Sequence, residues 1–139
     1  MLEKAIEFAK KVHEGQIDKA GKPYIYHCLR VMEMGQSEEE KILGVLHDVI
    51  EDGGHEVERE IYEIFGGKVL ENVKFLTRRK CEPYFDYIAR FRKNELARIV
   101  KLNDLKDNLD VTRFDKLTEK HLSLLNRYIK AYNILKNPF

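Results

Sequence analysis

Hydrophobic residues recur every three or four positions along most of this chain, which is the spacing of one face of an α-helix. The first such run includes Leu2, Ile6 and Val12 and stops before Gly15. No segment keeps the strict alternation of apolar and polar residues that marks a half-buried strand, and no hairpin turn sequence is found. The pattern therefore predicts an all-α fold, a compact single-domain bundle of seven to eight helices around one core.

Glycine, proline and capping residues set the expected ends of these helices. Ser37 precedes Glu40 by three residues, which is the spacing of a capping box, and Asn94 is a favourable cap for a long helix. Helices are expected over residues 2–12, 27–35, 38–53, 57–65, 69–76, 83–91, 95–109 and 119–136. The longer connections between them are 15–23, 77–82 and 110–118.

The composition fits one domain that spans residues 1–139. Hydrophobic residues make up 43% of the chain, enough for a core, and charged residues make up 35%, enough to cover a helical surface. The formal net charge is only +1, so no overall field attracts nucleic acid or an anionic membrane. We therefore expect no nucleic-acid partner, and an anionic substrate would need a local cluster of cations.

Neither end of the pattern indicates export or membrane insertion. The first residues begin an amphipathic pattern instead of a signal peptide, and no apolar run approaches the ~18 residues of a membrane span. The two cysteines, Cys28 and Cys81, lack the spacing of a metal site and are expected to be free thiols. These features predict a cytoplasmic location without a membrane partner, and they leave the oligomeric state open, a homo-oligomer included.

Four ionisable side chains interrupt the apolar run 44–53: His47, Asp48, Glu51 and Asp52. If this run is one helix, the imidazole shares one ridge with Glu51 and the two aspartates share the next. An unpaired carboxylate in an apolar helix costs several kcal/mol, and a divalent cation removes that cost. The run therefore predicts a metal site with an acid/base pair beside it.

The remaining ligands of such a site must come from other helices. His27 opens the helix after the first loop, Asp104 interrupts an apolar ridge, and Asn108 lies four residues on, on the same face. Imidazole nitrogens and carboxylate oxygens suit Mn²⁺, Fe²⁺, Zn²⁺ or Mg²⁺. A site of this kind keeps positions for water and a substrate oxygen, so it can activate water and polarise a phosphoryl group.

The same residues resemble the H…HD…D signature of HD-superfamily metal-dependent phosphohydrolases. Three segments, 21–27 (GKPYIYH), 46–52 (LHDVIED) and 100–108 (VKLNDLKDN), are similar to the hydrolase domain of RelA/SpoT proteins and to stand-alone small alarmone hydrolases. The motifs occur in the same order, and the resemblance covers nearly the whole chain. It implies an all-α HD-type domain that hydrolyses the 3′-pyrophosphate of guanosine tetra- and pentaphosphate.

The resemblance also implies roles for individual residues. One divalent metal ion, usually Mn²⁺ in this family and otherwise Fe²⁺, Zn²⁺, Mg²⁺ or Co²⁺, would be bound by His27, His47, Asp48 and Asp104. Glu51 and Asp52 would activate or orient the attacking water, and Asn108 would lie near the nucleotide. Further contacts to the phosphorylated substrate are expected at Lys19, Lys22, Tyr24 and Lys101.

This chain departs from the family pattern at positions that affect the choice of substrate, and not at the expected metal ligands. The Arg-Lys pair that is common in the first loop reads Asp18-Lys19 here, and the Arg that often follows Asn108 is Asp110. Cys28 replaces the proline that usually follows the first ligand histidine. Two other functions therefore stay open: a phosphatase for another nucleotide or small phosphorylated metabolite, and a non-catalytic nucleotide sensor that keeps the metal.

The remaining polar and aromatic residues are expected to have structural roles and not to take part in the site. The basic segment 78–80 is expected to be a solvated connector, and the aromatic residues of 84–87 are expected to pack in the core. Three histidines have no matching partners in the motifs and are interpreted as ordinary: His13, His55 and His121.

Overall fold

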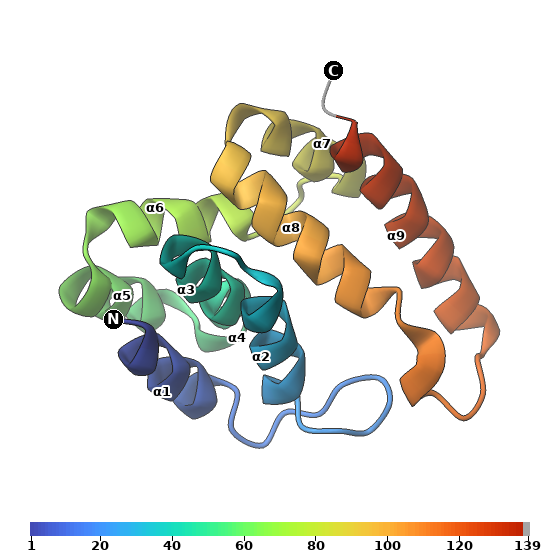
Figure 1. Cartoon of the computed structure of the whole chain (residues 1–139), viewed down its shortest axis with the longest axis horizontal. Coiled ribbons are helices and arrows are strands. Elements are labelled where there is room, and N and C mark those ends of the chain that lie inside the picture. The colour runs from blue at the N-terminus through green and yellow to red at the C-terminus, as the bar shows by residue number, and fades with distance from the viewer. Residues whose placement is uncertain (138–139) are drawn as a thin grey trace.

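The computed structural model describes residues 1–137, which form nine α-helices, two short 3-10 helices and no β-strand beyond one isolated bridge (Figure 1). The elements are α1 (Leu2–Val12), α2 (Ile25–Met34), α3 (Glu38–Leu46), α4 (Val49–Gly53), α5 (His55–Phe65), α6 (Gly67–Leu76), α7 (Tyr84–Ala89), η1 (Arg90–Lys93), α8 (Glu95–Asn108), η2 (Val111–Arg113) and α9 (Glu119–Lys136). The all-α prediction is confirmed. Within the same residues, no helix combines the length and the apolar character needed to cross a membrane.

The helix predicted over residues 38–53 is broken in two. The Nδ1 atom of His47 lies 2.6 Å from the carbonyl oxygen of Gly44, and Asp48 has left the helical conformation at φ −109° and ψ 3°. In a continuous helix this carbonyl would accept a hydrogen bond from the backbone N–H of Asp48. The imidazole of His47 therefore competes with that N–H for the same acceptor. The expectation of one continuous helix was wrong, and α4 starts in a new direction.

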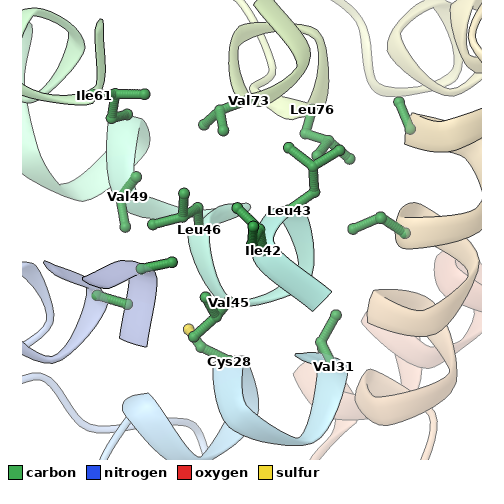
Figure 2. Close-up of a cluster of buried hydrophobic side chains, with 14 of the residues drawn as sticks. Cys28, Val31, Ile42, Leu43, Val45, Leu46, Val49, Ile61, Val73 and Leu76 are labelled. Carbon is green, nitrogen blue, oxygen red and sulfur yellow. The ribbon is translucent and has the colours of Figure 1, made fainter. Parts of the chain in front are cut away.

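The core is built around α3, which is buried along most of its length. Figure 2 shows Val45 and Leu46 of α3 surrounded by side chains of neighbouring helices. The other labelled residues are Cys28, Val31, Ile42, Leu43, Val49, Ile61, Val73 and Leu76. Because so many helices pack against α3, the residue that follows it, His47, is fixed at the centre of the molecule.

Gly44 lets α2 approach α3 closely. A Cβ atom at this position would lie 3.0 Å from the Cα atom of Met32 on α2, which is closer than nine in ten Cβ contacts in proteins. The absence of a side chain therefore allows the two backbones to touch. This contact brings His27, near the start of α2, close to His47.

The long helix α8 connects the two halves of the fold. It packs on α2 and α3 with one face and on α9 with another, as Figure 1 shows for the orange and red ribbons. Its side toward α2 and α3 carries Asp104 and Asp107, both buried. The helix start foreseen at Asn94 is confirmed, because the Asn94 side chain accepts the backbone N–H of Ala97.

Arg90 fixes the connection between α6 and α7. Its guanidinium donates to both carboxylate oxygens of Glu82, at 2.8 and 3.1 Å, and to the backbone carbonyls of Phe75 and Thr77. The side chain also lies over the rings of Phe75 and Tyr87, each about 5.1 Å from the guanidinium carbon. The connector 77–82 is thus attached to the body of the protein through one arginine.

We predict that Glu82→Gln destabilises the fold at neutral pH by about 1–2 kcal/mol, because a charge-assisted bidentate pair becomes a neutral one. The bond to Arg90 lowers the pKa of Glu82, so its stabilisation is present above the unfolded pKa of about 4.3 and is lost as pH falls through the lower folded value. Urea unfolding at pH 7 and pH 3 should show the difference between variant and wild type shrinking in acid. Equal differences at both pH values would contradict this account, and Glu7→Gln on α1 is the exposed control.

Candidate metal centre

Three buried side chains from distant parts of the chain converge on one point. The Nε2 atom of His27 lies 3.3 Å from Nε2 of His47 and 2.9 Å from Oδ1 of Asp104, and Nε2 of His47 lies 3.2 Å from the same oxygen. Metal–ligand bonds of about 2.1 Å place neighbouring ligand atoms about 3 Å apart. The spacing of the three donor atoms therefore fits a single ion.

Asp48 completes the set of four residues that the sequence indicated. Its Oδ2 atom lies 3.0 Å from Nε2 of His47 and accepts a hydrogen bond from the hydroxyl of Tyr24. The structure thus brings His27, His47, Asp48 and Asp104 together, and their role as ligands remains a prediction. Tyr24 was expected to contact the substrate, and in the structure it also contacts a predicted metal ligand.

The hydrogen bonds of the two imidazoles direct their free nitrogens toward each other. Nδ1 of His27 lies 2.6 Å from a carboxylate oxygen of Asp107, and Nδ1 of His47 lies 2.6 Å from the carbonyl of Gly44. Both partners are acceptors, so each Nδ1 carries the proton and donates. In neutral rings the two Nε2 lone pairs would then face each other beside the carboxylate of Asp104. Positive charge at this point, from protons or a metal ion, stabilises that arrangement.

The charges around the site favour positive charge at this point. Burial alone would lower the pKa of His47, but the charges of Asp48 and Asp104 outweigh it and hold that pKa well above its usual value. Burial alone would raise the pKa of Asp104, yet Lys101 and His47 hold it well below its usual range. A divalent ion would take the place of the protons that the imidazoles otherwise attract.

Asp107 was not predicted as a site residue, but its carboxylate binds the ring nitrogen of His27 that faces away from the other predicted ligands. Its carboxylate accepts from His27 on one side and from Arg30, at 2.7 and 3.1 Å, on the other. Burial would raise the pKa of Asp107, but the bonds to His27 and Arg30 lower it to about 2. Its position three residues after Asp104 on one helix was the available signal, because residues three apart share a face.

Glu51 lies on α4, next to the cluster of histidines and aspartates. Partial burial, together with the negative charge of Asp48, raises its pKa to about 7 although the residue is accessible from the surface. A carboxylate that titrates near neutral pH is well suited to accept and return a proton. The geometry therefore allows the role that the resemblance implied for this residue.

Asp52 lies near a histidine that the sequence gave no reason to select. The Nδ1 atom of His13, at the end of α1, lies 2.7 Å from the side-chain oxygen of Gln16 and 3.3 Å from Oδ2 of Asp52. His13 is only 2% exposed, and its ring also packs against Tyr24. The contact is made across almost forty residues of sequence, which explains why periodicity alone missed it.

A cavity of about 300 Å³ opens beside the metal centre. Its polar lining includes Lys19, Tyr24, His27 and Asn108, and its apolar lining comes largely from η2 to α9. The apolar residues are Ile17, Phe114, Leu117, Leu124 and Leu125. Cavities with a mainly apolar wall and a few convergent polar groups are typical of small-molecule sites.

Five substrate contacts were predicted, and the structure places them in two groups. Lys19, Tyr24 and Asn108 line the cavity, whereas Lys22 is exposed on the loop and does not line it. Lys101 also lies outside the cavity, where its Nζ donates to Oδ2 of Asp104 at 2.8 Å. Lys101 therefore borders the metal centre instead of the cavity.

Comparison with known proteins assigns the family. The model of the HD domain matches residues 5–101, which include His27, the His47-Asp48 pair and Glu51. The chain belongs to the HD domain family. This membership implies that the protein binds a divalent metal ion, and the cluster of His27, His47 and Asp104 offers a site for it.

Several relatives contain a similar HD domain. The guanosine-3′,5′-bis(diphosphate) 3′-pyrophosphohydrolase of Aquifex aeolicus is 33% identical over 120 residues, which cover 78% of this chain and 17% of that protein. The GTP pyrophosphokinase of Myxococcus xanthus is 38% identical over 82 residues, which cover 56% of this chain and 11% of that protein. This chain thus spans less than a fifth of the length of these curated relatives.

A solved structure shares the fold over nearly all of this chain. It belongs to a protein described as a metazoan ortholog of SpoT that hydrolyzes ppGpp, and it aligns with a TM-score of 0.76 at 21% sequence identity. The alignment covers 99% of this chain and 86% of that chain. The HD-type arrangement of helices expected from the sequence is therefore confirmed.

We predict that His47→Ala and Asp104→Ala abolish metal binding, because each removes a donor atom from a site with few ligands. Wild-type protein at 100 times its metal dissociation constant should gain about 2.7 kcal/mol in unfolding free energy, and the variants should gain nothing. Metal analysis after gel filtration and thermal unfolding with and without Mn²⁺ measure both effects. The control is His55→Ala on α5, a fully exposed histidine. Retention of metal by either site variant would refute this assignment of ligands.

Proposed function

We propose that this HD domain is a metal-dependent phosphohydrolase that cleaves a phosphoester of a phosphorylated nucleotide, with guanosine 3′,5′-bis(diphosphate) as its substrate. The observation that carries the proposal is the pair of imidazole nitrogens, 3.3 Å apart, that point at one carboxylate beside the 300 Å³ cavity. The name of the Aquifex relative supports the choice of substrate. We infer Mn²⁺ as the ion because the resemblance to the RelA/SpoT hydrolase domain implies it, and mixed nitrogen and oxygen donors are compatible with it.

The residues around the centre supply the steps of hydrolysis. When bound, the metal ion supplies the Lewis acid that polarises a phosphoryl oxygen. His27, His47, Asp48 and Asp104 would hold the ion. Glu51, with a pKa of about 7, accepts a proton from the attacking water and returns it to the departing oxygen. Asp52, which lies near His13, orients that water.

The cavity supplies the binding site for the nucleoside. Its apolar wall accommodates the face of a base, while Lys19 and Asn108 present a cation and an amide to phosphate or ribose oxygens. Asn108 also donates to Oδ1 of Asp104 at 3.1 Å, so a substrate that contacts it lies next to the metal centre.

One observation favours testing other substrates. Asp18 lines the cavity at the position where the family usually has an arginine, and its Oδ1 accepts the backbone N–H groups of Ala20 and Lys22. This carboxylate therefore shapes the loop and faces the cavity with negative charge. A different base or a smaller phosphorylated metabolite is the alternative that this change supports.

The experiment is a panel of phosphorylated nucleotides and sugar phosphates with Mn²⁺, in which released phosphate and pyrophosphate are measured separately. We expect pyrophosphate from guanosine 3′,5′-bis(diphosphate). Release from a different compound would move the assignment to that substrate. Tight binding of the guanosine compound without any release would establish a sensor in place of an enzyme.

We predict that Asp52→Asn lowers kcat by about 10²–10⁴-fold while bound metal stays unchanged, because the variant keeps the shape of the side chain and loses its charge. Parallel measurements of turnover and metal content separate the two effects. If metal and rate fall together, Asp52 supports the structure of the site and does not act on the water.

A further inference from the structure

A group of positive charges surrounds Tyr84 on the side of the metal centre formed by α7, α8 and α9. The guanidinium carbon of Arg127 lies 4.0 Å from the centre of the Tyr84 ring, and that of Arg78 lies 5.5 Å from it. Lys101 approaches from α8, with its Nζ 5.1 Å from the neighbouring ring of Tyr87. We call Arg78, Tyr84, Lys101 and Arg127 the Tyr84 cluster.

Negative charge is scarce around the Tyr84 cluster. Within residues 1–137, neither Arg78 nor Arg127 forms an ion pair, and Arg78 donates instead to the backbone carbonyl of Glu82. Lys101 has a carboxylate partner, Asp104, which is itself a predicted metal ligand. Three cations on three different elements thus share one carboxylate, an arrangement that attracts an anion.

The Tyr84 cluster also contains polar atoms that nothing in the described chain satisfies. The hydroxyl of Tyr84 and the Nε atom of Arg127 are buried and have no hydrogen-bond partner among residues 1–137. A buried polar group without a hydrogen-bond partner lowers the stability of the fold. Two such groups beside unpaired cations indicate a ligand with several acceptor oxygens. Arg78 is exposed, as expected for the basic segment 78–80, but it lies over the ring of Tyr84, whose buried hydroxyl has no partner among the described residues.

The Tyr84 cluster adjoins both parts of the proposed active site. Lys101 bonds to Oδ2 of Asp104, whose other oxygen faces the two histidines. Tyr128, the residue after Arg127 on α9, lines the 300 Å³ cavity. A phosphate bound at the Tyr84 cluster would therefore lie next to a phosphate bound at the metal centre.

We propose that the Tyr84 cluster is the subsite for the outer phosphate of the diphosphate group that leaves during hydrolysis. This inference rests on the proposed function. It includes Lys101, a predicted substrate contact, and adds Arg78, Tyr84 and Arg127 to the site. A guanidinium matches two phosphate oxygens at once, a lysine adds a point charge, and the tyrosine hydroxyl donates one further bond.

With the outer phosphate at the Tyr84 cluster, each bond, proton and charge of the reaction has a place. The water oxygen forms a bond to the inner phosphorus, and the bond between that phosphorus and the nucleoside 3′ oxygen breaks. Glu51 takes the proton from water and passes it to the 3′ oxygen, which leaves as a hydroxyl. The diphosphate keeps its negative charge, which the Tyr84 cluster neutralises as the product separates.

We predict that the Tyr84 cluster sets the preference for a 3′-diphosphate over a 3′-monophosphate. The test compares kcat/KM for guanosine 3′,5′-bis(diphosphate) with that for the 3′-monophosphate 5′-diphosphate. Arg127→Met keeps an unbranched chain over the ring but loses the charge and the donors, so the ratio should fall about 10- to 100-fold. Tyr84→Phe removes only the hydroxyl and should lower the ratio less, while metal content stays unchanged in both variants.

The matched control is Lys130→Met, one turn further along α9. Lys130 is an exposed cation that lies over the ring of Phe85, with its Nζ 4.5 Å from the ring centre. Its removal should leave the ratio unchanged. If Arg127→Met lowers kcat/KM equally for both substrates, or if neither site variant changes the ratio, the subsite is refuted.

A binding measurement separates this inference from the proposed function. Inorganic pyrophosphate and orthophosphate are titrated into the metal-loaded protein after excess metal has been removed. Arg127→Met and Tyr84→Phe should weaken pyrophosphate binding at least several-fold and leave orthophosphate binding nearly unchanged. If wild type hydrolyses neither guanosine compound, the proposed function fails, but this titration still reports on the subsite. Equal pyrophosphate affinity in wild type and both variants would overturn the subsite by itself.

Discussion

Two imidazole nitrogens that face each other inside the protein are the constraint on which this structure depends. The Nδ1 atom of each ring is already hydrogen-bonded, that of His27 to Asp107 and that of His47 to the carbonyl of Gly44. The Nε2 lone pairs of both rings therefore point to the same place. That arrangement is stable only when positive charge lies between them. The close contact of α2 and α3 at Gly44, the break after α3 and the packing of α8 all serve to bring these groups to that point.

Several of the predicted site residues contact a supporting side chain. Asp107 accepts from His27 and is itself bound by Arg30, Lys101 donates to Asp104 within α8, and His13 lies near Asp52. Supporting contacts of this kind fix the rotamers of ligands and catalytic groups, and they tune the pKa values of both. Arg30, Lys101 and Asp107 lie on the helices that carry the motifs, α2 and α8. Only His13, at the end of α1, comes from an element without a predicted site residue.

Local signals in the sequence predicted most of the helices and their ends, because caps and apolar periodicity act over a few residues. Ser37 does accept the backbone N–H of Glu40, as expected. The break at His47 was not predictable in this way, since it depends on an imidazole that takes a carbonyl from its own helix. The contact between His13 and Asp52 was missed for a related reason, because it forms only when α1 packs beside α4.

Helix α8 places four functional groups on one face, at intervals of one turn or less: Lys101, Asp104, Asp107 and Asn108. A rigid helix moves as a unit, so any shift of α8 against α2 disturbs metal affinity and substrate contact at the same time. The loop 15–23 and helix α9, in contrast, border the substrate and contribute no predicted ligand. Substitutions in those two segments can therefore change which molecule is bound, whereas almost any substitution on this face of α8 would disturb the site.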